Sequence, residues 1–558
     1  MAEQVVTPPS PESPKMLSSS SGTPEPSTEA PTKKKFGEHT LVEGDYESAP
    51  SLMFAALVVL SVTFVGFTFG FDTGTISGIT GFPDYIERFG QLNHATGEYY
   101  FTTTRKSLII AFYSVGGGVG GIFLSGFANT IGRKYSLLIF LSIYVVGNII
   151  QITSGHGKWY QMFIGRIITG LSSGALASVA PMFGGELSPA KYRGALVCSF
   201  QLFLTLAIFL GYCCDYATKE HNSGAAQWRI VMGLNFLWAF LIFALVWIVV
   251  PESPRYLAEI GKGDKAKETI AYINKVPLKS RFVEEEYKAI EEGILTEQAA
   301  GTASWKELIT GKPKIFPRVV MGFMIMALQQ LSGINYFFYY GTTIFAAVGL
   351  QDSYQTVIVL GVVNFASTIF SLYFVDKFGR RSTLIGGSIV GAIALYIYTI
   401  LGVVALYPNG RDEASSKPVG NAMIFLTCLF IAAFAASWGA IGYVILAESF
   451  PIRIRAKASS VGILSSFLWN FLISFFTPYI TNAIHFSFGF IFAGCLTFAI
   501  GYIYFTVYET KGLTLEEVDL MYGDKKCNPW NSANWKNKDK SLDETKVDST
   551  DVSEHETV

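Results

Sequence analysis

The segments that decide the fold are ELSPAKYR at residues 186–193 and ESFPIRIR at residues 448–455, each directly after a long apolar run. Their Glu, Pro and Arg residues recur 262 positions apart. The tripeptide Gly132-Arg133-Lys134 returns as Gly379-Arg380-Arg381, 247 positions later. Short charged clusters that recur between membrane-length apolar runs are typical of a transporter built from two parallel repeats.

The composition is that of a membrane protein. The 558 residues are 50% hydrophobic and only 15% charged, and their mean hydropathy is +0.37. A bilayer core needs about 20 apolar residues per helix, and segments such as 231–250 and 486–508 supply them. The net charge of -1 offers no strongly basic face to a nucleic acid. The six cysteines show no metal or disulfide spacing.

We predict an all-α membrane protein with twelve transmembrane helices in two pseudo-symmetric six-helix halves, because every backbone polar group in lipid must be satisfied internally. The expected spans are 52–79, 108–128, 136–154, 159–182, 195–216, 231–250, 318–347, 355–375, 382–406, 421–447, 458–482 and 486–508. The expected divisions are a disordered N-terminal tail (1–50), the first half (51–250), linker helices (251–317), the second half (318–508) and a C-terminal tail (509–558).

The distribution of Lys and Arg predicts the orientation. These residues gather around 132–134, in the 251–317 block and around 377–381, and they are sparser in the loops on the other side. Because loops rich in Lys and Arg stay in the cytoplasm, both termini and the linker are expected there.

Several motifs resemble those of a known family. They are Gly165-Arg166, Glu186 to Gly194, Pro251 to Arg255, QQLSGIN at 329–335 and Val375 to Arg381. Together they resemble the sugar porter family of the major facilitator superfamily. NYFFYYG at 335–341 and ETKG at 509–512 are most similar to its yeast hexose transporter branch. The resemblance covers about residues 50–525 and implies monosaccharide transport across the plasma membrane by alternating access.

A sugar site needs amide side chains, because each sugar hydroxyl both donates and accepts hydrogen bonds. Polar groups within spans are costly unless they serve a function. The resemblance implies that substrate contacts come from Gln201, Gln329, Gln330, Asn335, Asn364, Tyr443, Phe467 and Asn470. For any single amide, hydrogen bonding between helices is an equal alternative, but the whole set favours a sugar site.

Aromatic residues bear on gating and specificity. Tyr339 and Tyr340 resemble the family's extracellular gate, with an interfacial aromatic belt as the alternative. Gly333 is expected to break the helix before them. Tyr443 and Phe467 stand where the family commonly has Trp. Since both changes remove an indole N–H, xylose and fructose remain candidates beside glucose.

Coupling depends on Asp72, a carboxylate in the first span, whose expected partner is Arg166 in the fourth. The resemblance implies a proton carrier here in symporters, but uncoupled yeast facilitators keep this Asp as well. Asn235 is neutral where some symporters have a second acid. We therefore favour facilitated diffusion, with proton symport as the alternative. The short C-terminal tail argues against a non-transporting glucose sensor, and the sequence offers no enzyme motif, metal site or cofactor site.

The repeated charges imply a cytoplasmic gate, in which ion pairs hold the outward-open state. At about 0.5–1 kcal/mol each, a few pairs would bias the two states without locking them. The alternative is membrane topology alone, which requires only the arginines. The residues concerned are Arg133, Glu186, Arg193, Glu252, Arg255, Arg380, Arg381, Glu448 and Arg455.

Overall fold

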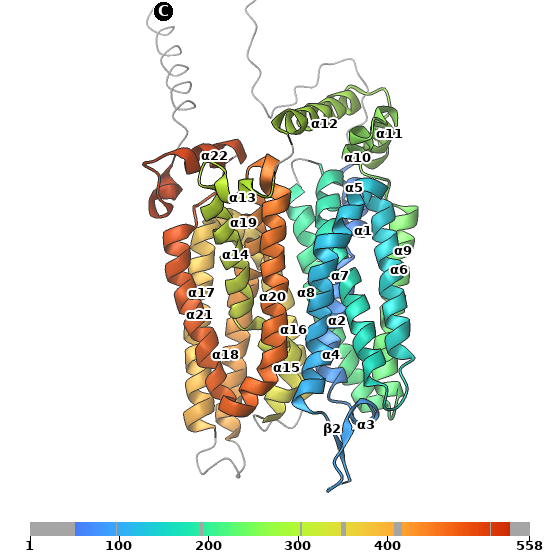
Figure 1. Ribbon diagram of the computed structural model, residues 1–558, viewed down its shortest axis with the longest axis vertical. Helices are drawn as coiled ribbons and strands as arrows, with labels where there is room; N and C mark the ends of the chain where they lie inside the picture. Colours follow the sequence, from blue (N-terminus) through green and yellow to red (C-terminus); the bar gives the residue numbers. More distant parts are fainter. Residues whose placement is uncertain are drawn as a thin grey trace, which may run out of the picture. The chain divides into compact units, whose positions relative to one another are not determined.

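The computed structural model describes residues 51–95, 97–189, 193–301, 304–347, 353–406, 416–513 and 515–535 (Figure 1). The predicted N-terminal tail and residues 536–558 lie outside this part of the chain.

The first half is a bundle of long helices in which the first span is broken. Its elements are α1 (Leu52–Thr63), α2 (Gly66–Ile79), α3 (Pro83–Phe89), β1 (Gln91–Leu92), β2 (Tyr99–Tyr100), α4 (Thr103–Val119), the π-helical turn η1 (Gly120–Leu124), η2 (Ser125–Phe127), α5 (Ala128–Ile131), α6 (Arg133–Ile152), α7 (Trp159–Leu187), α8 (Arg193–His221) and α9 (Ala226–Ile248). The two short strands pair antiparallel, with Gln91 opposite Tyr100.

Four short helices link the halves: α10 (Pro254–Glu259), α11 (Gly263–Asn274), α12 (Arg281–Ala300) and α13 (Glu307–Thr310). The second half contains α14 (Ile315–Leu331), α15 (Ile334–Ala347), α16 (Ser353–Phe378), α17 (Arg380–Ile400), the π-helical turn η4 (Leu401–Ala405), α18 (Lys417–Ala436), α19 (Trp438–Glu448), α20 (Ile452–Ile484), η5 (His485–Ser487) and α21 (Phe488–Thr506). The chain then forms α22 (Leu515–Gly523) and η6 (Pro529–Asn534). The linker helices, α22 and η6 lie at the same end of the molecule, which we call the linker end (Figure 1). The opposite end is called the far end.

The helices confirm the predicted fold class. In the described residues, ten segments are long and apolar enough to cross a membrane, and there are eleven if α1 and α2, bent by 42°, form one span. The last of these segments, Arg453–Thr506, holds both α20 and α21. The arrangement is therefore consistent with twelve crossing helices.

Glycines allow neighbouring helices to approach closely. A Cβ atom on Gly70 of α2 would lie 2.1 Å from the Leu204 carbonyl oxygen of α8, and a Cβ on Gly174 of α7 would lie 1.9 Å from the Gly117 carbonyl oxygen of α4. Both distances are far below a normal contact, so a larger residue at either position would push the helices apart.

The first part of the segment that we expected to be a C-terminal tail is structured, because it forms α22 and η6. Val518, Met521 and Tyr522 share one face of α22 and are buried with Cys527. Arg318 at the start of α14 pairs with Asp519 on the same helix. The apolar spacing of 518, 521 and 522 is that of an amphipathic helix, which the polar composition of the region concealed.

Candidate substrate site and gates

A chain of amides lies at the break between α14 and α15. The Gln329 Nε2 donates to the Trp438 carbonyl oxygen at 2.7 Å, and the Gln330 Nε2 donates to the Ser466 hydroxyl at 2.8 Å. The Asn335 Nδ2 donates in turn to the Gln330 Oε1 at 2.5 Å. All three amides are buried. The predicted amides of this region therefore belong to one hydrogen-bonded group.

The break itself is made by Gly333. Its φ is +91°, and a Cβ there would lie 2.6 Å from the Phe492 ring. Only glycine adopts this conformation readily. The α14 helix ends at Leu331 and α15 begins at Ile334. Because the helix is interrupted there, Gln330 and Asn335 can meet although they are five positions apart.

Asn470 on α20 is a second polar centre, and it joins the two halves. Its Oδ1 accepts hydrogen bonds from the hydroxyls of Ser114 on α4 at 2.9 Å, Ser474 at 3.2 Å and Tyr339 at 3.3 Å. An amide oxygen has two lone pairs, so these three donors compete for it. A contact of this kind can change when the halves move.

The other predicted substrate residues have fewer contacts. The Gln201 Nε2 lies 3.8 Å from where a Cβ of Gly439 would be, so Gln201 faces α19 from α8. Asn364 on α16 is buried, and its Nδ2 has no hydrogen-bond partner within the described residues. Tyr443 on α19 is 48% exposed. The Phe467 ring lies against Gly117, where a Cβ would be 2.5 Å from it.

Tyr339 and Tyr340 are buried inside the protein. The Tyr340 hydroxyl donates to the Ser474 carbonyl oxygen at 2.7 Å, and the Lys106 ammonium lies 5.7 Å from the Tyr340 ring centre. Their burial does not favour the alternative of an aromatic belt, whose residues face the membrane surface. Their role as a gate remains a prediction.

Further hydrogen bonds join the halves toward the far end. The Ser77 and Thr342 hydroxyls are 3.0 Å apart, and the Tyr354 hydroxyl donates to the Gly78 carbonyl oxygen at 2.9 Å. The Tyr479 hydroxyl also contacts the Thr104 hydroxyl at 2.7 Å. Sequence analysis missed these residues, because Ser, Thr and Tyr are too common in helices to form a recognisable pattern. Together they join the two halves at the far end.

Asp72 and Arg166 form the predicted pair. The Arg166 Nη1 lies 2.7 Å from both oxygens of the Asp72 carboxylate, and the Arg166 Nε donates to the Ile109 carbonyl oxygen at 3.2 Å. The guanidinium also lies 4.6 Å from the Tyr113 ring centre. Both charges are buried, so each depends on the other for compensation.

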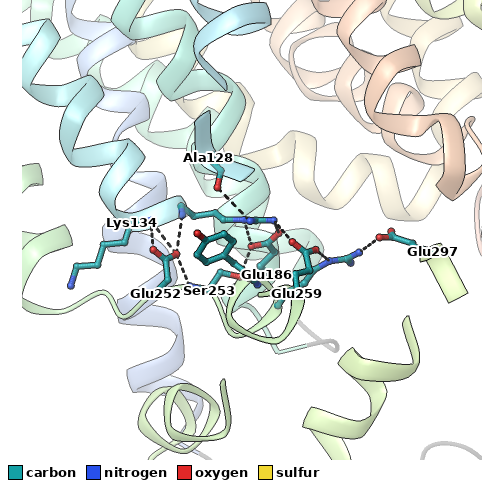
Figure 2. A network of polar contacts seen from close by, with 10 residues as sticks. Ala128, Lys134, Glu186, Glu252, Ser253, Glu259 and Glu297 are labelled. Atoms are coloured by element: carbon teal, nitrogen blue, oxygen red, sulfur yellow. Dashed lines mark hydrogen bonds and ion pairs between the residues drawn. The ribbon is translucent and has the colours of Figure 1, made fainter. Parts of the chain in front are cut away.

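At the linker end, Arg133 contacts a cluster of carboxylates, Glu186, Glu252 and Glu259, which are labelled in Figure 2. Its side chain donates to both carboxylate oxygens of Glu186 at 3.1 and 3.2 Å and reaches Glu259 at 3.5 Å. Its backbone N–H donates to Glu252 at 2.9 Å. Burial raises the pKa of the Glu252 carboxyl above its ordinary value, while backbone hydrogen bonds, including those from Ser253, oppose the shift.

The second half repeats this cluster. Arg380 donates to both oxygens of Glu448 at 3.2 and 2.9 Å, and Glu509 accepts the N–H groups of Arg380 and Arg381 at 2.9 and 3.1 Å. The Thr510 hydroxyl donates to Glu448 at 2.6 Å, as the Ser253 hydroxyl donates to Glu186 at 2.5 Å. The two repeated motifs of the sequence therefore meet in space in each half, with Glu252 and Glu509 as equivalent partners of the arginine N–H groups.

The remaining predicted gate residues differ in their surroundings, and Arg255 joins the Arg133 cluster through the shared Glu259. Arg255 pairs with Glu259 and Glu297 in the linker. Arg455 donates from its Nε to the Phe450 carbonyl oxygen at 3.3 Å. The Arg193 side chain lies outside the described residues. Arg133 pairs with Glu186 of the first half and with Glu259 of the linker helix α10, and Arg380 pairs with Glu448 of the second half. These ion pairs brace the linker end of each bundle.

The chemistry of this centre suits reversible binding of an uncharged polar solute. It offers uncharged amides, hydroxyls and aromatic rings, which suit a neutral solute rich in hydroxyls. The described residues hold no group of three or more His, Cys, Asp or Glu side chains placed to bind a metal. Two bundles with polar amides between them and braced ends define a membrane transporter of the alternating-access class.

The comparisons identify the family. The family model described as "Sugar (and other) transporter" matches residues 58–522. The chain is 49% identical over 481 residues to the low-affinity glucose transporter HXT3 of Saccharomyces cerevisiae, covering 86% of this chain and 84% of the relative. It is 48% identical over 506 residues to the low-affinity glucose transporter of Kluyveromyces lactis, covering 90% and 88%. The chain belongs to this sugar transporter family.

Solved structures agree with this assignment. The proton:xylose symporter XylE of the major facilitator superfamily, bound to 6-bromo-6-deoxy-D-glucose, matches with a TM-score of 0.68 and 25% identity, over 84% of this chain and 99% of the other. The partially occluded inward-open form of XylE from E. coli matches with a TM-score of 0.67 and 25% identity, over 83% and 99%.

Proposed function

We propose that this protein carries glucose and related monosaccharides, xylose among them, across the plasma membrane by facilitated diffusion. The proposal rests on the hydrogen-bonded side-chain amides of Gln329, Gln330 and Asn335, which lie at a helix break. It rests as well on the close relation of the chain to glucose transporters. Amides can exchange their mutual hydrogen bonds for sugar hydroxyls at little net cost, since donors and acceptors are conserved in number.

The proposal places the substrate between the halves. Gln201, Asn364, Tyr443, Phe467 and Asn470 would line the site, with Tyr339 and Tyr340 as the extracellular gate. The linker end would face the cytoplasm together with both termini, in keeping with the positive-inside rule. The residue ranges 51–250 and 318–508 would then be the two moving halves, joined by the helices of 251–317.

Uptake of radiolabelled sugar into cells that lack their own sugar carriers tests the proposed function. We expect glucose uptake to saturate. We also expect unlabelled glucose, fructose, galactose and xylose to inhibit it in a defined order. No uptake despite normal surface abundance would contradict the proposal and would favour a glucose sensor.

Proton symport is the second candidate, and the buried Asp72–Arg166 pair favours it. The structurally similar XylE is a proton:xylose symporter. An uncoupler separates the two mechanisms. Facilitated diffusion predicts that uptake only equilibrates and is indifferent to the uncoupler. Symport predicts accumulation that collapses with the uncoupler, together with acidification of the cytosol during uptake.

A further inference from the structure

A second buried carboxylate lies near the far end, apart from Asp72. Asp215 on α8 is 1% exposed, and neither of its carboxylate oxygens has a hydrogen-bond partner within the described residues. The Gly78 backbone is a polar neighbour of this carboxyl without reaching hydrogen-bond geometry. A Cβ on Gly78 would lie 2.1 Å from the Asp215 Oδ2, so the carboxyl is pressed against α2. An ionised carboxylate in such a place is strongly disfavoured, whereas a protonated one is tolerated.

The surrounding charges do not compensate Asp215. The titratable and charged groups near it on its own helix and on the helices around it include Tyr212, Cys213, Cys214, Tyr216, Lys219, Glu220 and His221 of α8, Asp72 of α2, Arg166 of α7, Arg229 of α9, Tyr336, Tyr339 and Tyr340 of α15, and Tyr354 of α16. The cations among them contact other groups, although the Arg229 Nε has no hydrogen-bond partner within the described residues. Arg166 binds Asp72, Lys219 pairs with Glu220 and lies over the Tyr354 ring, and Arg229 lies over the Trp228 ring.

The position of Asp215 ties it to the contacts that close the far end. Gly78, which lies against the Asp215 carboxyl, accepts through its carbonyl oxygen a hydrogen bond from Tyr354 of the other half. Its chain neighbour Ser77 shares three hydrogen bonds with Thr342, which also lies in the other half. One turn before Asp215, the Tyr212 hydroxyl donates to the Phe338 carbonyl oxygen at 3.4 Å. Separating the halves here would break these contacts and bring water to the carboxyl.

We propose that Asp215 is a proton-binding site that holds the far end closed: the carboxyl keeps one proton while the end is closed, and releases it to external water when α2 and α8 separate from α15 and α16. Closing takes the proton back. The inference rests on the proposed function, because it takes the far end as the extracellular one. Low external pH then favours the closed end, and fewer carriers present their sugar site outward.

The first test measures initial glucose entry at several external pH values, with the cytosolic pH held constant. Since apparent affinity scales with the outward-open fraction, the half-saturating glucose concentration should rise about threefold or more between external pH of about 7.5 and about 5. In the Asp215→Asn variant the half-saturating glucose concentration should be high and independent of pH. The matched control is Glu220→Gln, which removes an exposed carboxylate from the same helix and should keep the wild-type profile.

Several outcomes would overturn the inference. The first is a half-saturating glucose concentration of the wild-type protein that does not change with external pH. This outcome can be seen without any variant. Another is an Asp215→Asn variant that keeps the wild-type profile, which would assign the dependence to another group such as Asp72. Asp215→Ser, which is smaller and cannot ionise, replaces the Asn variant if that variant does not reach the surface.

A second measurement does not depend on sugar transport. A cysteine introduced as Thr342→Cys is labelled from outside with a membrane-impermeant maleimide, and the labelled peptide is quantified against that of an exposed Glu98→Cys at each pH. The ratio should fall about threefold or more on acidification, and Asp215→Asn should abolish the fall. Sugar uptake without these pH effects would reject the inference alone. Absent uptake with these effects would reject the proposed substrate and leave the proton site standing.

Discussion

Glu509 caps the helix that begins at Arg380: its carboxylate accepts the Arg380 N–H at 2.9 Å. Glu252 holds the Arg133 N–H in the first half at the same distance. The glycine before each arginine has a positive φ, +105° at Gly132 and +87° at Gly379, and brings the carboxylate within reach of the helix end. A carboxylate at a helix N-terminus satisfies free N–H groups and interacts well with the helix dipole.

Removing either cap should destabilise the protein by a similar amount. We expect Glu509→Ala and Glu252→Ala each to lower the free energy of unfolding by about 1–2 kcal/mol, because each leaves backbone N–H groups of α17 or α6 without an acceptor. Thermal unfolding of the purified protein measures the effect. Glu285→Ala in the exposed part of α12 is the control. If Glu509→Ala and Glu252→Ala shift the unfolding temperature no more than this control, the two glutamates do not act as caps.

The stability of the protein should show a pH-dependent contribution from Asp84 on the short helix α3. Burial opposes ionisation of this carboxyl, but hydrogen bonds from Arg88 and Trp228 and the charge of Arg88 outweigh it, so its pKa lies below the ordinary 3.8. A lowered carboxyl pKa stabilises the folded protein above the ordinary pKa, and this stability is lost as pH falls through the lower value.

Asp84→Asn should therefore cost about 1 kcal/mol at neutral pH, and the difference from wild type should shrink below pH of about 4. Unfolding temperatures of the two proteins across this range give the result. Glu87→Gln, an exposed acid on the same helix, is expected to show neither effect. A difference for Asp84→Asn that is constant with pH would mean that packing, and not charge, is responsible.

The break at Gly333 predicts a position intolerant of any side chain. Gly333→Ala must carry a Cβ at φ +91° and against the Phe492 ring, which should cost about 1–3 kcal/mol and displace Asn335. We expect lower surface abundance and a clear loss of uptake per carrier. Gly386→Ala is the control, because a Cβ there meets nothing within 4 Å. Equal behaviour of the two variants would contradict a special role for the break.

Much of this architecture could be predicted from sequence because membrane helices leave a strong one-dimensional record. The predicted span at 355–375 became α16 (Ser353–Phe378), and the bend of the first span was the main irregularity that hydropathy could not show. The repeats at Arg133 and Arg380 predicted a recurring set of charged residues, and the structure shows which of them pair, Arg133 with Glu186 and Arg380 with Glu448.

The remainder depends on three-dimensional packing. Nothing in the sequence around Asp215 marks it as buried without a partner, because one acid near the end of a long apolar helix usually reaches water. The contact of Asn470 with Ser114 likewise depends on how α20 and α4 cross, which hydropathy does not determine. The predicted amides were chosen by chemical type and family resemblance, and which of them touch each other had to come from the structure.

The Asp72–Arg166 pair allows a test of charge compensation. Asp72→Asn leaves the buried Arg166 without its partner and should lower stability by about 3–5 kcal/mol. Asp72→Asn combined with Arg166→Gln should be less destabilised than the single variant, because no net charge remains buried. Unfolding of purified protein decides this, and a double variant that is the sum of two independent losses would contradict mutual compensation. Under facilitated diffusion, sugar in cells carrying Asp72→Asn should still reach the external concentration, although more slowly.

Asn335 offers the sharpest test of the amide group. Asn335→Ala strips a side chain that donates and accepts at once, and it leaves Gln330 with an unsatisfied Oε1. We expect uptake to fall at least about a hundredfold at normal surface abundance, since a buried polar group without its partner is poorly tolerated where the sugar must bind. Asn222→Ala makes the same chemical change outside the apolar core and should transport normally. Because Asn335→Asp keeps the shape but loses the donor, it separates the hydrogen bond from the volume: loss of uptake in both Asn335 variants assigns the role to the N–H donor. Kinetics equal to wild type in Asn335→Ala would remove this residue from the substrate site.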